Sequence, residues 1–336
     1  MVGILIRGAG VAGLAAAHEL AERGFNVEII DRAGAVGHGA SHFAGGMLAP
    51  FCERETAGEA VLTLGLQAAD WWEAAVPGSV TRQGTLVLAP GRDVNELSRF
   101  AARTTGFEWV DEAGIAALEP DLRGRFRRGL FFADEAHLDP QTTLADLARR
   151  LHERGARFHL DTVAPPDRRS HAAVIDCTGP QAIGKLAGLR AVRGEMLVVE
   201  TFELHLRRPV RLLHPRYPIY LVPRSNGRVM IGATMLETED DGAISVQSLM
   251  ELLNAAYALH PAFAKARLVE TGVGLRPAFP DNLPRVVETD EGLAIAGMHR
   301  HGFLLAPAMA RQTADLLLKR LEGDRTPSDN NRRTFR

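Results

Sequence analysis

The chain has 336 residues, of which 46% are hydrophobic and 24% are charged, and its formal net charge is −2. This length accommodates two associated domains with large cores, whereas the near-neutral charge gives no electrostatic footprint for nucleic acid or an anionic membrane. Cys52 and Cys177 are the only cysteines and lack metal-ligand spacing, so we expect neither a disulfide framework nor a metal site. With no basic leader and no run of roughly 20 apolar residues, we predict a cytoplasmic enzyme whose partners are small molecules.

The chain opens with the pattern of a dinucleotide-binding unit. A short apolar strand leads into a G-x-G-x-x-G turn at Gly8, Gly10 and Gly13, an Ala- and Leu-rich helix follows, and a second strand ends in Asp31. The first glycine permits a tight turn, the second lets a pyrophosphate approach the backbone, and the third allows the helix to pack on the strand. In this pattern the phosphate lies at the helix N-terminus, and the acidic residue, here Asp31, accepts a hydrogen bond from a ribose hydroxyl. Nicotinamide and flavin cofactors both fit this pattern.

The next segment, GHGASHFAGGMLAP at residues 37–50, is too apolar for a surface linker. Backbone with such small side chains can pass close beneath a flat ring system or a diphosphate, because glycine leaves room for a ligand. A flexible loop is the alternative interpretation.

The central part of the chain alternates between helical and extended patterns. A lone histidine near a strand end, His137, is more often structural than functional. Two short apolar strands typical of a parallel sheet follow, and the second leads into Cys177-Thr178-Gly179. The segments that carry the dinucleotide-binding pattern are therefore discontinuous in the sequence. We expect helices over 60–76, 97–105, 142–154 and 246–260, and strands over 80–89, 129–132, 157–163 and 172–176.

From residue 193 the pattern becomes antiparallel, and Asn226-Gly227 between two alternating runs indicates a two-residue hairpin turn. A type I′ turn at this point would pair Tyr220 with Ala233. Met235 would then be a diagonal neighbour of Tyr220 on the same face of the sheet. From these residues alone, both side chains could belong either to the core or to a site.

The stretch GVGLRPAFPDN, residues 272–282, places Arg276 between small, apolar and ring-locked neighbours. A guanidinium in such a wall needs an anionic partner. A ligand carboxylate and an internal Asp or Glu would each serve, and both remain open. The last patterned segment, residues 293–321, predicts a strand, a loop and an amphipathic helix.

Four separated motifs, in this order, make the chain resemble the FAD-dependent amine oxidases of the D-amino acid oxidase family, and within it the glycine oxidases of the thiamine pathway. They are the N-terminal fingerprint with Ala40-Ser41 and the run 45–50, the Tyr220/Met235 hairpin, Gly-Leu-Arg-Pro at 274–277, and His-Arg-His-Gly-Phe at 299–303. The resemblance covers nearly the whole chain.

The resemblance implies an α/β fold in which a discontinuous, Rossmann-like FAD-binding domain is joined to an antiparallel-sheet substrate-binding domain. It also implies a homo-oligomer. The expected boundaries are 1–75, 141–190 and 266–322 for the FAD-binding domain, 76–140 and 191–265 for the substrate-binding domain, and 323–336 for a C-terminal tail.

The resemblance assigns roles to individual residues as well. Arg276 is expected to form a forked salt bridge to a substrate carboxylate, Tyr220 to bond the same group, Met235 to form an apolar wall, and Arg300 to lie beside the pocket. The N-terminus of the last helix is expected to point at the flavin N1–C2=O edge and to stabilise negative charge there. The residues expected at the cofactor are Gly8, Gly10, Val11, Ala12, Gly13, Asp31, Arg32, Ala40, Ser41, Gly45, Gly46, Met47, Val163, Cys177, Thr178, Gly179, Arg276, His299, Arg300, His301, Gly302, Phe303 and Leu304.

The implied reaction is oxidation of glycine or another small amino acid by hydride transfer to the N5 atom of a non-covalently bound FAD. Dioxygen would reoxidise the flavin and yield hydrogen peroxide, while the imine is hydrolysed or captured for thiazole synthesis. No acid-base side chain is obligatory, because the cofactor carries the electronics. The alternatives are a relative acting on sarcosine, a D-amino acid or an N-substituted glycine, a dehydrogenase that passes electrons to a quinone, and a catalytically silent FAD-binding protein.

Overall fold

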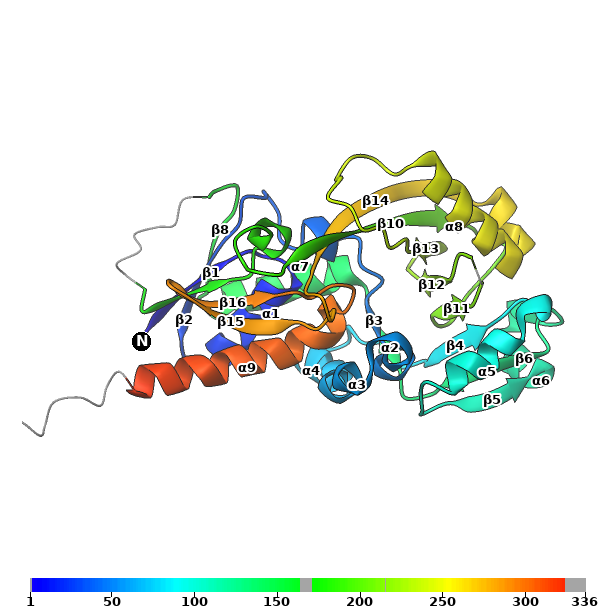
Figure 1. Cartoon of the computed structure of the whole chain (residues 1–336), viewed down its shortest axis with the longest axis horizontal. Helices are drawn as coiled ribbons and strands as arrows, with labels where there is room; N and C mark the ends of the chain where they lie inside the picture. The colour runs from blue at the N-terminus through cyan, green and yellow to red at the C-terminus, as the bar shows by residue number, and fades with distance from the viewer. Residues whose placement is uncertain (1, 164–170, 215, 324–336) are drawn as a thin grey trace, which may run out of the picture.

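The computed structural model describes residues 2–163, 171–214 and 216–323. Two large sheets dominate it and lie side by side along the long axis of the molecule (Figure 1). The expected C-terminal tail lies, after Gly323, outside the described residues. Within the described ranges, no helix is long and apolar enough to cross a membrane.

The first sheet is parallel except for its antiparallel β15–β16 pair. Its β1 strand buries Ile4, Leu5 and Ile6 completely, as a strand covered on both faces requires. Helix α1 (Val11–Glu22) packs against α9 (Gly302–Gly323), which runs along this sheet in Figure 1, and also against α7 (Pro140–Glu153). The strand order is β15 (Arg285–Thr289), β16 (Gly292–Ala296), β9 (Ala173–Asp176), β1 (Gly3–Arg7), β2 (Asn26–Ile30) and β8 (Arg157–His159).

The second sheet is antiparallel apart from the parallel β11–β4 pair. Side chains alternate between its faces. On one face Leu197, Leu221 and Ile231 pack with α8 (Val246–Leu259), whereas the other face packs against Phe43 and Met47. The strand order is β14 (Arg267–Ala278), β10 (Arg190–Glu200), β13 (Arg228–Gly232), β12 (Ile219–Pro223), β11 (Val210–Leu212), β4 (Thr85–Leu88), β6 (Arg128–Phe132) and β5 (Glu108–Asp111).

Shorter elements connect the two sheets. A small two-stranded sheet links the segment after Gly46 to the strand before α7, and three short helices follow that segment in the chain. The helix expected over 60–76 is interrupted near Leu66, so it forms two of these short helices. The remaining elements are β3 (Met47–Leu48), β7 (Ala136–His137), α2 (Pro50–Ala57), α3 (Glu59–Gly65), α4 (Ala68–Ala75), α5 (Asn95–Ala101) and α6 (Glu112–Leu118).

The structure differs from the expected boundary at residue 266. Strand β14 pairs along its whole length with β10, so residues 267–278 belong to the antiparallel sheet and not with the first sheet. The chain returns to the first sheet only at β15. Arg276 is therefore presented by the second sheet.

The register of the hairpin also differs from the expected one. Asn226 and Gly227 have the positive φ values, 60° and 70°, that the expected turn needs. Ser225, however, is an extra residue in the loop, because Arg224 donates its N–H to the carbonyl of Arg228 at 2.8 Å. Every pair further along therefore slips by one residue. Consequently Tyr220 pairs with Gly232 instead of Ala233, and Met235 lies beyond the end of β13.

Candidate active site

The glycine-rich turn lies at the carboxyl edge of the first sheet, between β1 and α1. Gly8 has a φ of 102°, and a Cβ on it would lie 2.4 Å from the Cys177 carbonyl oxygen. A Cβ on Gly13 would lie 1.8 Å from the oxygen of Gly8, so the helix packs this close only because both residues lack side chains. Gly10 precedes the helix in extended conformation and, as a glycine, supplies no side-chain cap of its own.

Two side chains reach the same turn. The Asp31 carboxylate accepts the Ala9 N–H at 2.6 Å and the Ala33 N–H at 2.8 Å. The Ser41 hydroxyl accepts the Val11 N–H at 3.1 Å. A carboxylate has about four acceptor positions, so Asp31 keeps capacity for a ribose hydroxyl.

Other segments end at this edge of the sheet. Strand β9 leads into Cys177-Thr178-Gly179, and β16 leads into the loop that precedes α9. A Cβ on Gly302 would lie 3.2 Å from Cγ1 of Val11, so α9 begins beside the start of α1. The N-termini of two helices thus meet where the parallel strands end. Open α/β sheets bind ligands at such places, and helix N-termini stabilise anions there.

Four glycines share one face of the second sheet, because residues paired across a ladder point to the same side. Gly194 pairs with Gly274, while Gly232 and Gly272 both pair with Met196. With four side chains missing, other groups pack closely against this face.

Residues 37–50 lie along this glycine-rich face of the second sheet. A Cβ on Gly272 would lie 2.2 Å from the ring of Phe43, and one on Gly274 would lie 3.1 Å from Cα of Ala40. The segment expected to pass beneath a cofactor is therefore packed directly on the strand that carries Arg276.

Tyr220 is on the same face and has its ring between two of the glycines that line the site. A Cβ on Gly45 would lie 2.9 Å from the ring, and one on Gly232 would lie 3.0 Å from it. Among the described residues, the Tyr220 hydroxyl has no hydrogen-bond partner. It is therefore available to a ligand.

Arg276 has an unusual set of contacts for a half-buried cation. Its Nη1 donates to the Thr234 carbonyl at 3.1 Å, and it forms no ion pair with any acidic side chain in the described part of the chain. Burial lowers the pKa of Arg276, and Arg300 adds to this effect, while Tyr220 and Glu53 oppose it. The guanidinium is thus desolvated without an anion to balance it.

Arg300, in contrast, is already paired. Its Nε lies 2.8 Å from Glu53 of α2, a residue only 7% exposed, which also contacts Arg211 and lies 3.3 Å from Nδ1 of His301. Although burial alone would raise it, the pKa of Glu53 is held well below its usual range by Arg300, Arg211 and His301. Arg300 also places Nη1 3.7 Å from the sulfur of Met235, which is 55% exposed.

The two histidines beside Arg300 are neutral at pH 7. Burial lowers the pKa of His299 to about 3 and that of His301 to about 4, and neighbouring positive charges contribute. His299 has a φ of 46° and donates its N–H to the Pro277 carbonyl at 2.9 Å. This bond joins the loop before α9 to the strand that carries Arg276.

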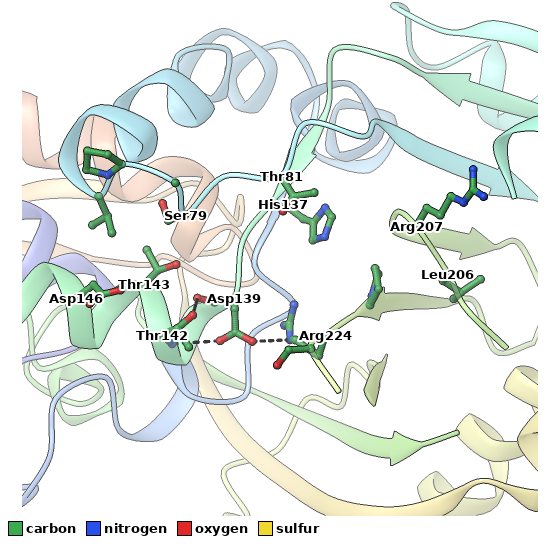
Figure 2. A pocket seen from close by; sticks show the side chains of 15 residues that line it. Ser79, Thr81, His137, Asp139, Thr142, Thr143, Asp146, Leu206, Arg207 and Arg224 are labelled. Carbon is green, nitrogen blue, oxygen red and sulfur yellow. Dashed lines mark hydrogen bonds and ion pairs between the residues drawn. The ribbon is translucent and has the colours of Figure 1, made fainter. Parts of the chain in front are cut away.

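A cavity of about 470 Å³ lies between residues 76–81, the start of α7 and the end of β12 (Figure 2). Arg224 and Asp139 line it and form an ion pair at 3.4 Å. Arg224 also donates to the carbonyls of Ala44 and Gly45, at 3.2 and 2.9 Å, and so joins the cavity wall to the 37–50 segment. His137 also lines the cavity, and burial lowers its pKa to about 4.

Two of the predicted cofactor residues lie toward the surface. Arg32 is exposed, and Val163 is 79% exposed. Val163 nevertheless follows Thr162, whose N–H donates to the Asp31 carbonyl at 3.0 Å. Both residues therefore lie at the Asp31 end of the edge, away from Arg276.

Comparison with known proteins accounts for this arrangement. The family described as "FAD dependent oxidoreductase" matches residues 3–316. The chain belongs to this family. A Rhizobium etli protein named as the thiamine biosynthesis oxidoreductase ThiO is 63% identical over 315 residues, which are 94% of this chain and 96% of the relative.

Glycine oxidases are also similar to this FAD-dependent oxidoreductase. The one from Geobacillus kaustophilus is 29% identical over 359 residues, covering 94% of this chain and 92% of the relative. The crystal structure of a glycine oxidase from that organism has the same fold, with a TM-score of 0.79 and 24% identity over 98% of this chain and 96% of the other. The predicted family, fold class and cofactor are thereby confirmed.

The residues at the carboxyl edge fit FAD. The first-turn N–H groups of α1 lack intrahelical acceptors and suit a diphosphate, and Gly10 leaves the approach to them open. Asp31 suits the ribose, the 37–50 backbone suits a flat ring, and the N-terminus of α9 suits an electron-rich edge. FAD would supply a two-electron acceptor at this edge.

The sequence patterns missed several residues of the site. Glu53 and Arg211 carry no local signal, because their partnership depends on elements 158 residues apart. The role of Thr234 was not predicted, because the expected hairpin register assigned the site to its neighbours Ala233 and Met235. Gly194 had a signal, since a glycine inside a strand often marks a close approach of another group.

Proposed function

We propose that this FAD-dependent oxidoreductase oxidises a small α-amino acid, with glycine the expected substrate and dioxygen the electron acceptor. One observation carries the proposal: Arg276 presents a desolvated guanidinium that has no acidic partner among the residues the structure describes. The names of its relatives, ThiO and glycine oxidase, support the same substrate class.

The substrate carboxylate would be held by Arg276 and Tyr220. A guanidinium fork pairs with the two oxygens of a carboxylate, and the free Tyr220 hydroxyl donates a further hydrogen bond. The Tyr220 ring packs against Gly45 and Gly232, so the ring itself has little freedom to move. Fixing the carboxylate in this way orients the α-carbon, and such positioning can contribute about 7 to 11 kcal/mol to catalysis.

Within the described part of the chain, no side chain of the site is suited to remove a proton from the substrate amine. The Nδ1 atoms of His299 and His301 are buried, and Arg300 is held by Glu53. We therefore assign no acid-base role to the protein, and propose that the amino acid reacts with its amine neutral. This requirement predicts faster turnover as the pH approaches the pKa of the substrate amine.

The products follow from the atom balance. FAD held at the carboxyl edge of the first sheet would supply the two-electron oxidation, in which the amino acid would lose the α-carbon hydride and one amine proton, and dioxygen would be reduced to hydrogen peroxide. The resulting imine is hydrolysed to a 2-oxo acid and ammonia, or is captured before hydrolysis. The name of the Rhizobium etli relative refers to thiamine biosynthesis, and it supports a role in that pathway, which we propose for this chain too.

Anaerobic bleaching of the bound flavin tests the proposal. Glycine, sarcosine, D-alanine and iminodiacetate should be compared with ethylamine, which lacks a carboxylate. Bleaching by glycine but not ethylamine, with peroxide released when air is admitted, would support the proposal. Bleaching without peroxide would indicate a dehydrogenase. Preferential bleaching by a larger amine would show that this amine, and not glycine, is the preferred substrate. If no amine bleaches the flavin, the protein binds FAD without catalysing amine oxidation.

A further inference from the structure

Gly194 lies beneath the guanidinium of Arg276. A Cβ on Gly194 would lie 2.1 Å from Nη2, 2.2 Å from Cζ and 2.5 Å from Nη1 of that side chain. Real Cβ contacts are never this short, so any side chain at this position must displace the fork. The backbone of Gly194 is not in the left-handed region, so the requirement for glycine there is one of space.

The second contact of the fork comes from the loop after β13. The Thr234 carbonyl accepts the Nη1 hydrogen of Arg276 at 3.1 Å. The side-chain hydroxyl of Thr234 accepts a hydrogen bond from the N–H of Glu195 at 2.9 Å and donates one to Glu195 Oε2 at 3.1 Å. Thr234 is therefore fixed to β10 through the residue that follows Gly194.

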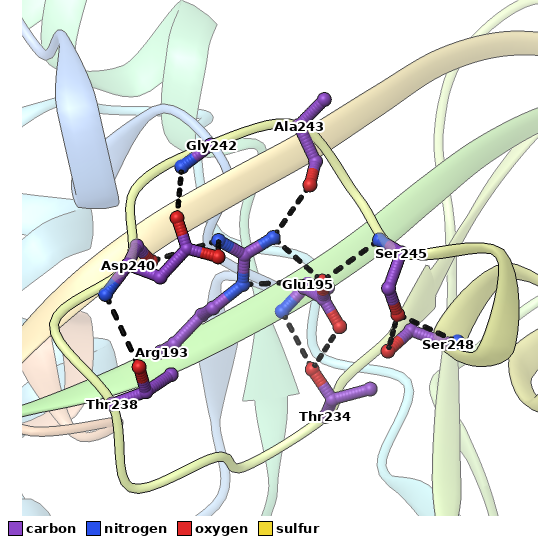
Figure 3. A network of polar contacts seen from close by, with 9 residues as sticks. All are labelled: Arg193, Glu195, Thr234, Thr238, Asp240, Gly242, Ala243, Ser245 and Ser248. Carbon is purple, nitrogen blue, oxygen red and sulfur yellow. Dashed lines mark hydrogen bonds and ion pairs between the residues drawn. The ribbon is translucent and has the colours of Figure 1, made fainter.

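Glu195 is itself held by a buried network (Figure 3). It is 0% exposed and accepts two N–H groups of Arg193, at 3.1 and 2.8 Å. Arg193 in turn donates to the carbonyls of Asp240 and Ala243, both at 2.7 Å. These bonds tie the loop between β13 and α8 to the strand beneath Arg276, and the network rigidifies because its buried charges are paired.

We propose that Gly194 and Thr234 are positioning residues that set the location of the Arg276 fork and thereby the affinity of the enzyme for a carboxylate. This inference rests on the proposed function, in which Arg276 receives the substrate. The guanidinium of Arg276 packs directly on the backbone of Gly194, and the hydrogen bond to the Thr234 carbonyl fixes the orientation of the guanidinium plane. The buried Arg193–Glu195 pair acts only through Thr234.

A purely structural role makes a different prediction. If Gly194 served only the packing of the second sheet, a methyl group there would lower stability and FAD content, and amino acid affinity would fall only in proportion. If it positions Arg276, the Michaelis constant rises while FAD content and kcat at saturation change much less. The split between KM and kcat therefore separates the two roles.

The test uses holoenzyme carrying Gly194→Ala, with Gly91→Ala as the matched control, since a Cβ on Gly91 meets nothing within 4 Å. FAD content is read from the flavin absorbance, KM and kcat from peroxide release with glycine, and carboxylate affinity from the spectral shift caused by glycolate. Loss of a charge-assisted hydrogen bond predicts an increase of about tenfold or more in KM and in the glycolate Kd for Gly194→Ala. Gly91→Ala should match the wild type.

Two further comparisons keep the inference testable if Gly194→Ala folds poorly. In an Arg276→Lys background, Gly194→Ala should raise the glycolate Kd no further, because the displaced guanidinium is gone. Thr234→Val should raise KM by several fold at unchanged FAD content, and Thr234→Ser, which keeps the hydroxyl bonded to Glu195, should restore it.

The outcomes separate this inference from the proposed function. Equal KM values for the Gly194→Ala and Gly91→Ala enzymes, additive effects with Arg276→Lys, or indistinguishable valine and serine variants at position 234 would each overturn the positioning role. Wild-type enzyme that neither oxidises an amino acid nor binds glycolate would instead overturn the proposed function, and the inference with it.

Discussion

Replacing Arg276 by lysine keeps the positive charge but removes the planar fork, so it isolates geometry from charge. In the structure the fork has one fixed bond, from Nη1 to the Thr234 carbonyl at 3.1 Å, which leaves other guanidinium N–H groups for a carboxylate. Lysine retains at most one comparable contact. A hydrogen bond to a charged group is worth about 1.5 to 3 kcal/mol, so kcat/KM for glycine should fall by about tenfold to a hundredfold.

The assay is peroxide release under varied glycine, accompanied by the FAD content of each preparation. Arg127→Lys serves as a control, because Arg127 is exposed and directly precedes β6, which lies near the opposite end of the second sheet from β14. We expect the Arg276→Lys enzyme to retain its FAD, because Arg276 extends from the second sheet and the first-turn groups of α1 are untouched. Parallel loss of FAD and turnover would show that Arg276 supports the fold and would refute the carboxylate role.

Three further predictions concern the surroundings of the site. Burial raises the pKa of Glu135 from 4.5 to about 7, so the folded state binds the extra proton between these values and stability falls as the pH rises through that window. At saturating FAD, urea titration should show that the free energy of unfolding of Glu135→Gln gains about 2.5 kcal/mol relative to the wild type between pH 5 and pH 8, because the buried histidines titrate alike in both proteins. Cys52 and Cys177 are 0% and 6% exposed, so acid precipitation should release all yellow colour into the supernatant, and colour in the pellet would reveal a covalent link. Gly272→Ala would put a Cβ 2.2 Å from Phe43 and push on the 37–50 segment, so FAD content should drop together with turnover; unchanged flavin absorbance would contradict this.

Local patterns predicted those parts of the molecule whose cause is local. The turn at Gly8 requires a positive φ and close contacts with residues nearby in the chain and with one neighbouring strand. These requirements produce the characteristic spacing of glycines in the sequence. Arg276 stood out because its immediate neighbours are apolar. The hairpin turn was likewise predicted at the right residues, but one extra loop residue, Ser225, shifted the register, which no count of turn propensities could have settled.

Features that depend on distant pairings were beyond these patterns. The boundary at residue 266 was misplaced because β14 is long and pairs with β10, which precedes it by more than 60 residues of intervening chain. Glu53 was missed for the same reason, since the two arginines that neutralise it come from β11 and from the loop before α9. A buried acid is costly by itself, and only the three-dimensional position of its partners explains why it is tolerated.

The different partners of Arg276 and Arg300 explain why only one of them awaits a ligand. Glu53 already forms an ion pair with Arg300, and a competing carboxylate would have to displace that pair. Among the described residues, Arg276 has a hydrogen bond to a neutral carbonyl and no ion pair, so its charge is unbalanced. Binding a carboxylate would relieve that imbalance and break no described salt bridge. A neutral amine of the same size would offer no such relief, so we expect the site to select the acid end of the proposed substrate.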